Sequence, residues 1–235
     1  MQSRELPFVR QMFDSIAPRY DLLNRLLSLR QDVAWRKALV ASMTIPENGR
    51  VLDVSCGTGD VVLEIRRQKG PLTQVTGLDF SMGMLRLAQE KIPVSQHGSI
   101  ALLNANALFM PFRRSSFHAV TIAFGIRNIQ DKSRALKAFY ECLKPGGILL
   151  VLELANPRQG KIMNAYLAYF QKVLPQIGRL FSKHSFAYSY LPESVSRFPS
   201  IDVFQKIMAD AGFTGITCRR LTLGVANLFV GAKAG

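Results

Sequence analysis

The stretch Arg50-Val-Leu-Asp-Val-Ser-Cys-Gly-Thr-Gly-Asp60 decides the fold of this chain. Residues 51–54 have the apolar pattern of a buried strand, and Gly57 and Gly59 separate it from a run that can continue as a helix. A strand that passes through paired glycines into a helix is typical of a nucleotide-binding βαβ unit. Glycine has no Cβ, so a ligand can lie directly against the backbone there.

Two acidic residues indicate which ligand such a unit would take. A dinucleotide fingerprint needs a third glycine where Val62 stands, and Asp53, just before the turn, would repel a pyrophosphate. Asp53 favours a cofactor with positive charge and no phosphate, such as S-adenosylmethionine. Asp79 ends a second strand, where a carboxylate can accept hydrogen bonds from two ribose hydroxyls. We therefore predict an S-adenosylmethionine site; the alternative is a tight turn with a solvated acid.

Strand and helix patterns alternate after residue 50. We predict strands at 50–55, 74–79, 99–103, 118–124 and 147–154, and helices at 60–69, 81–91 and 131–143. A helix at 201–211 and two strands at 214–222 and 225–232 follow, and Lys144-Pro-Gly-Gly147 reads as a sharp helix-to-strand turn. The alternation predicts an α/β fold with a doubly wound, mostly parallel, Rossmann-like sheet and its ligands at the carboxyl ends of the strands. With no repeat or low-complexity linker, we predict one domain over residues 1–235.

The N-terminal region, residues 1–45, precedes the first strand and has a helical apolar pattern interrupted at Pro18. Tyr20 and Asn24 lie just after this predicted helix break, where polar contacts to a ligand can be made. Two interpretations stay open, a lid over the cofactor and a plain helical cover over the sheet.

Residues 155–195 form a predicted helical insertion before the last strands. The segment 154–192 contains no Asp or Glu, five Lys or Arg and four of the six tyrosines, with an apolar stripe at helical spacing. Such a segment suits an amphipathic cover that contacts lipid or roofs an apolar substrate pocket. An ordinary packed helix pair with a solvated basic face is the alternative.

The composition bounds the class of protein. Thirty Lys and Arg against sixteen Asp and Glu give a net charge of +14, which favours an anionic partner, either nucleic acid or an acidic membrane surface. We see no apolar run long enough to span a bilayer and no signal peptide, so we expect a cytoplasmic protein. The three cysteines have no metal-ligand spacing, so we expect neither a metal site nor a disulfide, and Cys56 reads as a small side chain rather than a reactive thiol.

Over nearly its whole length the chain resembles the UbiE/MenG family of quinone C-methyltransferases, which use S-adenosylmethionine. The most specific element is the segment 124–131, since other methyltransferases share the glycine turn but not the Arg-Asn pair. The segments that carry the resemblance are Met12-Phe-Asp-Ser-Ile-Ala-Pro-Arg-Tyr-Asp21, Trp35-Arg36, Asp53 to Asp60, Leu78-Asp79, Asn106-Ala107, Phe124-Gly-Ile-Arg-Asn-Ile-Gln-Asp131, Leu143-Lys-Pro-Gly-Gly147 and Tyr190-Leu-Pro-Glu-Ser194. The chain departs from the family at Arg30, where glycine is common, at His118, where aspartate is frequent, and at Lys183-His184, where Gly-Asp is more usual.

The resemblance implies a class I methyltransferase fold with a seven-stranded sheet, and methylation of the ring of demethylmenaquinol to menaquinol. The benzoquinol precursor of ubiquinone is a further substrate that it implies. Arg127 and Asn128 are the implied catalytic residues, holding the quinol oxygens or a water; a salt bridge from Arg127 to Asp131 is the alternative. The implied cofactor contacts are Asp53, Gly57, Thr58, Gly59, Asp79, Asn106, Ala107, Ala123, Tyr20 and Asn24, with a plain turn role as the alternative for Asn106. Tyr166, Tyr188 and Tyr190 are substrate candidates, for which core packing is the alternative.

The resemblance also implies partners, a polyprenylated quinol and the inner face of an anionic membrane with peripheral contact, and no nucleic acid. The oligomeric state stays open. The rival hypothesis is an RNA methyltransferase, which the basic charge favours. The chain has Ala123-Phe124-Gly125 where base methylases usually carry an Asp/Asn-Pro-Pro-aromatic loop, and no cysteine is placed to attack a pyrimidine. A domain that binds the cofactor only to hold a partner is a weaker alternative.

Overall fold

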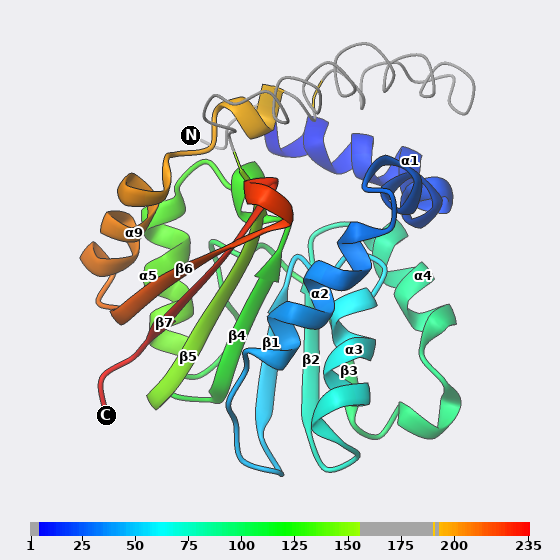
Figure 1. Ribbon diagram of the computed structural model, residues 1–235. Coiled ribbons are helices and arrows are strands. Elements are labelled where there is room, and N and C mark those ends of the chain that lie inside the picture. Colours follow the sequence, from blue (N-terminus) through cyan, green and yellow to red (C-terminus); the bar gives the residue numbers. More distant parts are fainter. Residues whose placement is uncertain (1–4, 156–189, 191–192) are drawn as a thin grey trace.

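The computed structural model describes residues 5–155, 190 and 193–235, with side chains from residue 11 onward (Figure 1). Its described strands form one seven-stranded sheet in the order β3-β2-β1-β4-β5-β7-β6. The strands are β1 (Arg50–Val54), β2 (Gln74–Asp79), β3 (Ile100–Asn104), β4 (Phe117–Ala123), β5 (Leu143–Leu154), β6 (Thr214–Leu221) and β7 (Ala226–Ala232). The first five pair in parallel, and β7 runs antiparallel between β5 and β6.

Helices cover both faces of the sheet, as the doubly wound pattern predicts (Figure 1). The helices are α1 (Glu5–Leu27), α2 (Gln31–Ala41), α3 (Asp60–Lys69), α4 (Met82–Lys91), α5 (Lys132–Cys142) and α9 (Ile201–Asp210), with single 3-10 turns η1 (Val94–Gln96), η2 (Ile126–Asn128) and η4 (Thr222–Gly224). Side chains of successive residues in β1 point to opposite faces of the sheet. Val51 packs among side chains of α2, α3 and α4, and Leu52 among side chains of α5 and α9.

The predicted doubly wound sheet is confirmed, and the predicted bounds of the strands and of the helices at 60–69, 81–91, 131–143 and 201–211 agree within one residue except the start of β5. That strand begins at Leu143, so the predicted sharp turn at 144–147 is wrong. These residues lie inside β5, whose pairing with β4 skips from Phe117↔Leu143 to Ala119↔Ile148. Gly146 has φ 73°, a conformation that glycine adopts without strain, and it absorbs this irregularity.

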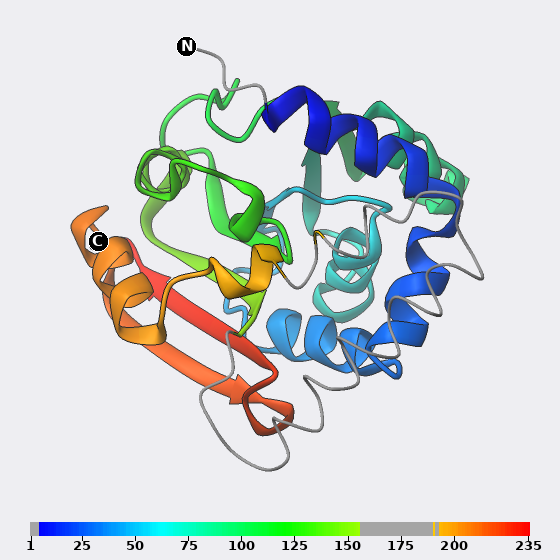
Figure 2. The same cartoon turned by 90° about the horizontal axis from the view of Figure 1, so that it is seen from above.

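The predicted helix break at Pro18 is also wrong. α1 continues through Pro18 and ends at Leu27, and the turn into α2 follows at Leu29 and Arg30, both with positive φ. A proline removes one backbone donor and bends a helix without necessarily ending it. Figure 2 shows α1 changing direction along its length. The insertion predicted at 155–195 lies mostly outside the described residues.

Candidate active site

The turn after β1 contains the first of the predicted ligand contacts. Gly57 has φ 55°, and a Cβ built on it would meet nothing closer than a ring carbon of Tyr20 at 4.0 Å. The Gly57 N–H donates to Asp79 Oδ2 over 2.8 Å, and the Ser81 N–H donates to Asp79 Oδ1 over 2.9 Å. Burial raises the pKa of Asp79, and these backbone bonds partly oppose the rise. The turn thus leaves open space against its backbone beside a fixed carboxylate.

A cavity of about 430 Å³ lies at the carboxyl ends of the strands. Gly57 and Asp79 line one part of it, and Arg127 and Asn128 line another. Asn106, Ala107, Ala123, Tyr20 and Tyr190 are also in its wall. The strand ends therefore bring together residues that are far apart in the sequence, as expected for an open α/β sheet.

Asp53 lies beneath this turn rather than in the cavity wall. It is 1% exposed, and its Oδ1 accepts a hydrogen bond from the Thr121 hydroxyl over 2.6 Å, while Oδ2 is buried without a partner. Burial, and to a lesser degree the nearby charges of Asp79 and Asp60, raise the pKa of Asp53 to about 7, against the bond from Thr121. A buried carboxylate oxygen that lacks a partner favours a cation nearby, so the site fits a positively charged cofactor.

Thr58 and Gly59, two predicted cofactor contacts, lie behind the turn and outside the cavity wall. The Thr58 hydroxyl donates to Asp21 over 2.6 Å and accepts from Lys91 over 3.0 Å. A Cβ on Gly59 would come within 3.2 Å of the Cβ of Ala88, so this glycine is needed for the close packing of α3 against α4. Both glycines have positive φ, as a tight turn requires, and the contacts of Thr58 and Gly59 are to α1 and α4.

Helix α1 covers the cavity, which combines the lid and the cover interpretations. Phe13 and Tyr20 line the cavity, whereas Asn24, one helical turn further on, does not. Asp14 binds the hydroxyl of Ser81 and accepts from the Gly83 N–H over 3.2 Å, which ties α1 to the start of α4. Asp14 therefore helps to hold α1 over the cavity.

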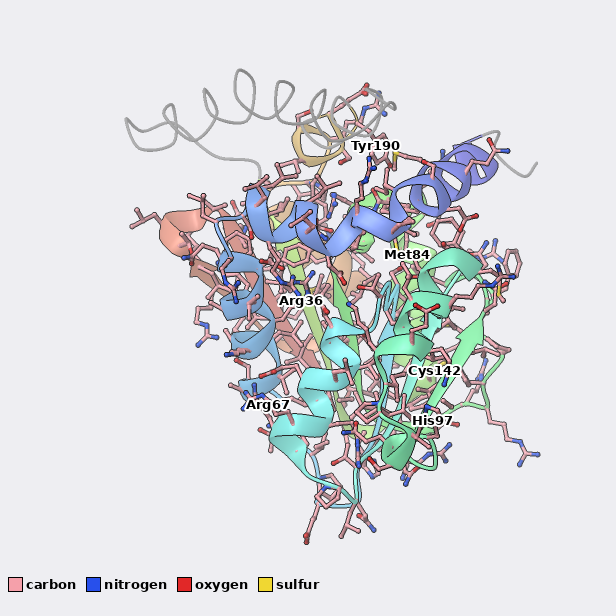
Figure 3. The ribbon with its side chains drawn as sticks, turned by 90° about the vertical axis from the view of Figure 1, so that its right-hand side faces the viewer. Arg36, Arg67, Met84, His97, Cys142 and Tyr190 are labelled. Carbon is pink, nitrogen blue, oxygen red and sulfur yellow. The ribbon has the colours of Figure 1, made fainter. Side chains whose placement is uncertain are left out.

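A second set of ionic contacts joins α1 to the elements behind the turn. Asp21 pairs with Lys91, and Lys91 reaches Asp60 over 3.0 Å. Arg25 binds Asp60 over 2.7 Å and also pairs with Asp32. We call these residues the α1 clamp, and they fix the helix to α2, α3 and α4. Figure 3 labels Arg36 on α2, which pairs with the same Asp32.

Asn106 fits both of its interpretations. Its Oδ1 accepts from the Leu108 N–H over 2.9 Å, which makes it a turn residue, and it also lines the cavity beside Ala107.

Cys56 is buried, and burial raises the pKa of its thiol well above the ordinary value, so it has no character of a reactive thiol.

Arg127 and Asn128 lie in η2, immediately after β4. The alternative prediction, a salt bridge from Arg127 to Asp131, is wrong. The Nη1 of Arg127 binds Glu153 Oε1 over 2.6 Å. Asp131 instead caps α5 by accepting from the Arg134 N–H over 2.9 Å. Glu153 is fully buried in β5. Sequence reasoning missed it, although an acid inside the continuous apolar run 148–154 is a signal of a buried, paired charge.

The far wall of the cavity includes Tyr190, whose hydroxyl donates to Asn128 Oδ1 over 3.0 Å. Figure 3 shows Tyr190 above α1 in that view. Lys132, which the sequence patterns did not single out, also lines the cavity; its Nζ donates to the Ile129 carbonyl over 2.8 Å, and burial lowers its pKa. Tyr166 and Tyr188 lie outside the described residues.

This sheet order, with a glycine turn and an acid at the ends of the first two parallel strands, defines a class I methyltransferase that uses S-adenosylmethionine. Solved structures share the fold. A methyltransferase in complex with the Haloferax volcanii Trm112 activator has a TM-score of 0.70 at 17% identity, covering 95% of this chain and 98% of that one. Phosphoethanolamine N-methyltransferase 2 of Haemonchus contortus, in complex with S-adenosyl-L-methionine, has a TM-score of 0.61 at 16% identity, covering 88% and 53%.

The chain belongs to the ubiE/COQ5 methyltransferase family, whose model matches residues 1–233. A protein of Geotalea daltonii named ubiquinone/menaquinone biosynthesis C-methyltransferase UbiE is 47% identical over 226 residues, which cover 96% of each chain. The demethylmenaquinone methyltransferase of Thermus thermophilus is 44% identical, covering 94% of this chain and 100% of that one. The predicted family and cofactor are thereby confirmed, and the chain is an S-adenosylmethionine-dependent methyltransferase.

Proposed function

We propose that this enzyme transfers the methyl group of S-adenosylmethionine to a ring carbon of demethylmenaquinol, giving menaquinol. The observation that carries the proposal is one cavity that joins the cofactor turn at Gly57 and Asp79 to the polar pair Arg127 and Asn128. The names of the relatives at 47% and 44% identity support the same substrate class.

The cofactor end of the cavity suits each part of S-adenosylmethionine. When bound, this cofactor supplies an electrophilic methyl group on a positively charged sulfur. Asp79 would accept from the ribose hydroxyls, Asn106 and Ala107 would flank the adenine, and the backbone at Gly57 would meet the methionine part. Asp53 would favour the cofactor's positive charge from beneath the turn.

The other end of the cavity suits a quinol ring. An arginine is a permanent cation and a poor base, so the role of Arg127 is to lower the pKa of a quinol hydroxyl and stabilise the resulting phenolate, which places electron density on the ring carbon. Asn128, held by Tyr190, would hold a quinol oxygen or an ordered water that takes the proton. Positioning of the ring carbon against the methyl donor supplies much of the acceleration.

The prenyl tail of such a substrate resides in a membrane. Within the described parts of the chain, no helix has both the length and the apolar character to cross a bilayer. We propose peripheral contact with the anionic inner face of the membrane, supported by the net charge of +14, and no nucleic-acid partner. The basic, aromatic segment 154–192 is the proposed contact, within one methyltransferase domain that spans residues 1–235.

Methyl-labelled S-adenosylmethionine tests the proposal. The purified enzyme is incubated with a short-chain demethylmenaquinol kept reduced, and in parallel with the matching benzoquinol precursor and with total RNA. We expect label in the naphthoquinol, and the benzoquinol arm decides whether both rings are accepted. Label that enters RNA but neither quinol contradicts the proposal and favours the RNA methyltransferase.

A further inference from the structure

We propose that Glu153 is a positioning residue for methyl transfer, because it fixes Arg127 at the cavity wall through both the side chain and the backbone of that residue. This inference rests on the proposed function, in which Arg127 acts on the quinol. Glu153 does not line the cavity, so any effect on the reaction has to pass through Arg127.

The carboxylate of Glu153 is fully buried, and all of its contacts bear on one small region. Oε1 accepts from Arg127 Nη1 over 2.6 Å and from the Leu154 N–H over 2.8 Å. Oε2 accepts from the backbone N–H of Arg127 over 3.1 Å. A single carboxylate therefore holds the guanidinium and the 3-10 turn that carries it. Charge-assisted bonds to a group without water access are the strong kind, so they restrict Arg127 to one conformer.

The remaining bonds of Arg127 show what this arrangement leaves available. Its Nη1 also donates to the Phe124 carbonyl over 2.6 Å, which uses both hydrogens of that nitrogen. Within the described residues, Nε and Nη2 have no hydrogen-bond partner, and Nε is buried. Both donors of Nη1 are thus occupied by the protein. The side chain still lines the cavity, and its other donors are available for a ligand.

The topology explains why an acid is placed here. β4 and β5 are neighbouring parallel strands, and the chain leaves β4 at Ala123 through a turn with Phe124 at φ 58°. Glu153 lies near the end of β5, where it reaches across to that turn and binds the Arg127 N–H. It ties the catalytic turn to the centre of the sheet rather than leaving it on a free loop.

A merely stabilising ion pair would make the same contacts, so the experiment has to separate the two roles. Glu153→Gln keeps one acceptor oxygen, removes the charge, and places an amide against the Arg127 N–H. We expect kcat for the short-chain demethylmenaquinol to fall at least tenfold, while the dissociation constant for S-adenosylhomocysteine, measured by calorimetry, stays within threefold. Asn227→Ala is the matched control, since Asn227 is the buried Cα partner of Glu153 on β7 and kcat should stay within twofold.

A double-mutant cycle with Arg127→Lys supplies the decisive readout. If Glu153 acts through the guanidinium, adding Glu153→Gln to Arg127→Lys lowers kcat by less than threefold further. The proposal is overturned if Glu153→Gln lowers kcat by the same factor in the wild type and in Arg127→Lys. It is also overturned if Glu153→Gln alone has a wild-type kcat. Where Glu153→Gln does not fold, Glu153→Asp keeps the charge and shortens the reach, and the same loss of kcat is expected; a wild-type kcat there also overturns it.

A readout without substrate separates this inference from the proposed function. The guanidinium ¹⁵N resonance of Arg127, assigned through Arg127→Lys, should be sharp in the wild type and broadened by exchange in Glu153→Gln. An unchanged resonance rejects the positioning role whatever the substrate is. Wild-type enzyme that methylates no quinol but shows this broadening rejects the proposed function and keeps the role of Glu153 in holding Arg127.

Discussion

The two glycines of the turn after β1 share a positive φ but face different surroundings. Gly57 adjoins the cavity, and Gly59 adjoins Ala88 of α4. At either position an alanine would carry the strain of the left-handed conformation, roughly 1–2 kcal/mol. The additional effect depends on what the new methyl group meets.

Comparing Gly57→Ala with Gly59→Ala tests this difference. The methyl group of Gly57→Ala enters cavity space, so we expect at least tenfold weaker binding of S-adenosylhomocysteine with a stability loss of only about 1–2 kcal/mol. In Gly59→Ala the methyl group crowds α4, so we expect a larger stability loss, about 2–4 kcal/mol once overpacking is added. Calorimetry and urea unfolding measure the two effects, and equal binding losses at both positions contradict the assignment.

The effect of Asp53 on the free energy of unfolding depends on pH. Its pKa is 3.8 in an unfolded chain and about 7 in the folded protein, so the folded state holds the proton more tightly. The resulting cost to stability is absent below about pH 4, grows as the pH rises and is complete above about pH 7, where it amounts to roughly 4 kcal/mol.

Asp53→Asn removes this cost to stability. The amide of the variant is itself buried, and its desolvation offsets roughly 1–3 kcal/mol of the gain. We therefore expect the variant to be more stable than the wild type at pH 8, by roughly 1–3 kcal/mol, and to lose that advantage at pH 4. Cofactor binding at pH 8 should weaken, because the buried anion is lost. Denaturant unfolding at both pH values is the measurement, and a stability difference that does not change with pH refutes the raised pKa.

Among the elements, α1 is the helix that covers the cavity. It supplies Phe13 and Tyr20 to the cavity and is fixed by the α1 clamp, whose charged side chains are at most 30% exposed. An enclosed cofactor needs this helix to move before it leaves, so the strength of the clamp should set the rate of release.

Asp21→Asn weakens the clamp without removing its volume. We expect S-adenosylhomocysteine to dissociate severalfold faster, with a change in unfolding free energy of about 1 kcal/mol or less, because both partners are only partly buried. Raising the salt concentration should speed release in the wild type and have less effect in the variant. Stopped-flow displacement measures the rates, with Asp210→Asn, which breaks the exposed pair to Lys206 on α9, as the control. Equal release rates in all three proteins contradict the clamp's role.

The sequence patterns located the elements better than the side-chain partners. Strand and helix periods follow from burial on one or two faces, so the described strands and helices after residue 50 could be predicted within a residue, apart from the start of β5. The break at Pro18 was misjudged because a bent helix and an interrupted one have the same pattern. The cofactor contacts predicted at Thr58 and Gly59 stay predictions; spacing in the sequence does not reveal which residues of a tight turn face the cavity, and the structure places only Gly57 of the three in the cavity wall. Glu153 was missed because its partner, Arg127, comes from another strand end.

At the scale of the whole molecule, the net charge of +14 is the strongest feature without a local explanation. Arg36 and Arg127, whose side chains are largely buried, each pair with an acid, so these two cations do not account for the excess. A surface with such an excess binds anionic lipid through long-range attraction, at about 1 kcal/mol for each Lys or Arg near the membrane, and salt screens it.

Sedimentation with lipid vesicles tests this attraction. We expect the protein to sediment with vesicles that contain 30% phosphatidylglycerol at 50 mM salt, to be released by 500 mM salt, and to remain in solution with phosphatidylcholine alone. Adding a long-chain demethylmenaquinol, kept reduced, to the anionic vesicles should give turnover that falls with salt, whereas turnover of a short-chain, water-soluble quinol should respond far less, because that substrate needs no membrane contact. Absence of sedimentation at low salt, or equal salt dependence for the two substrates, contradicts a reaction at the membrane surface.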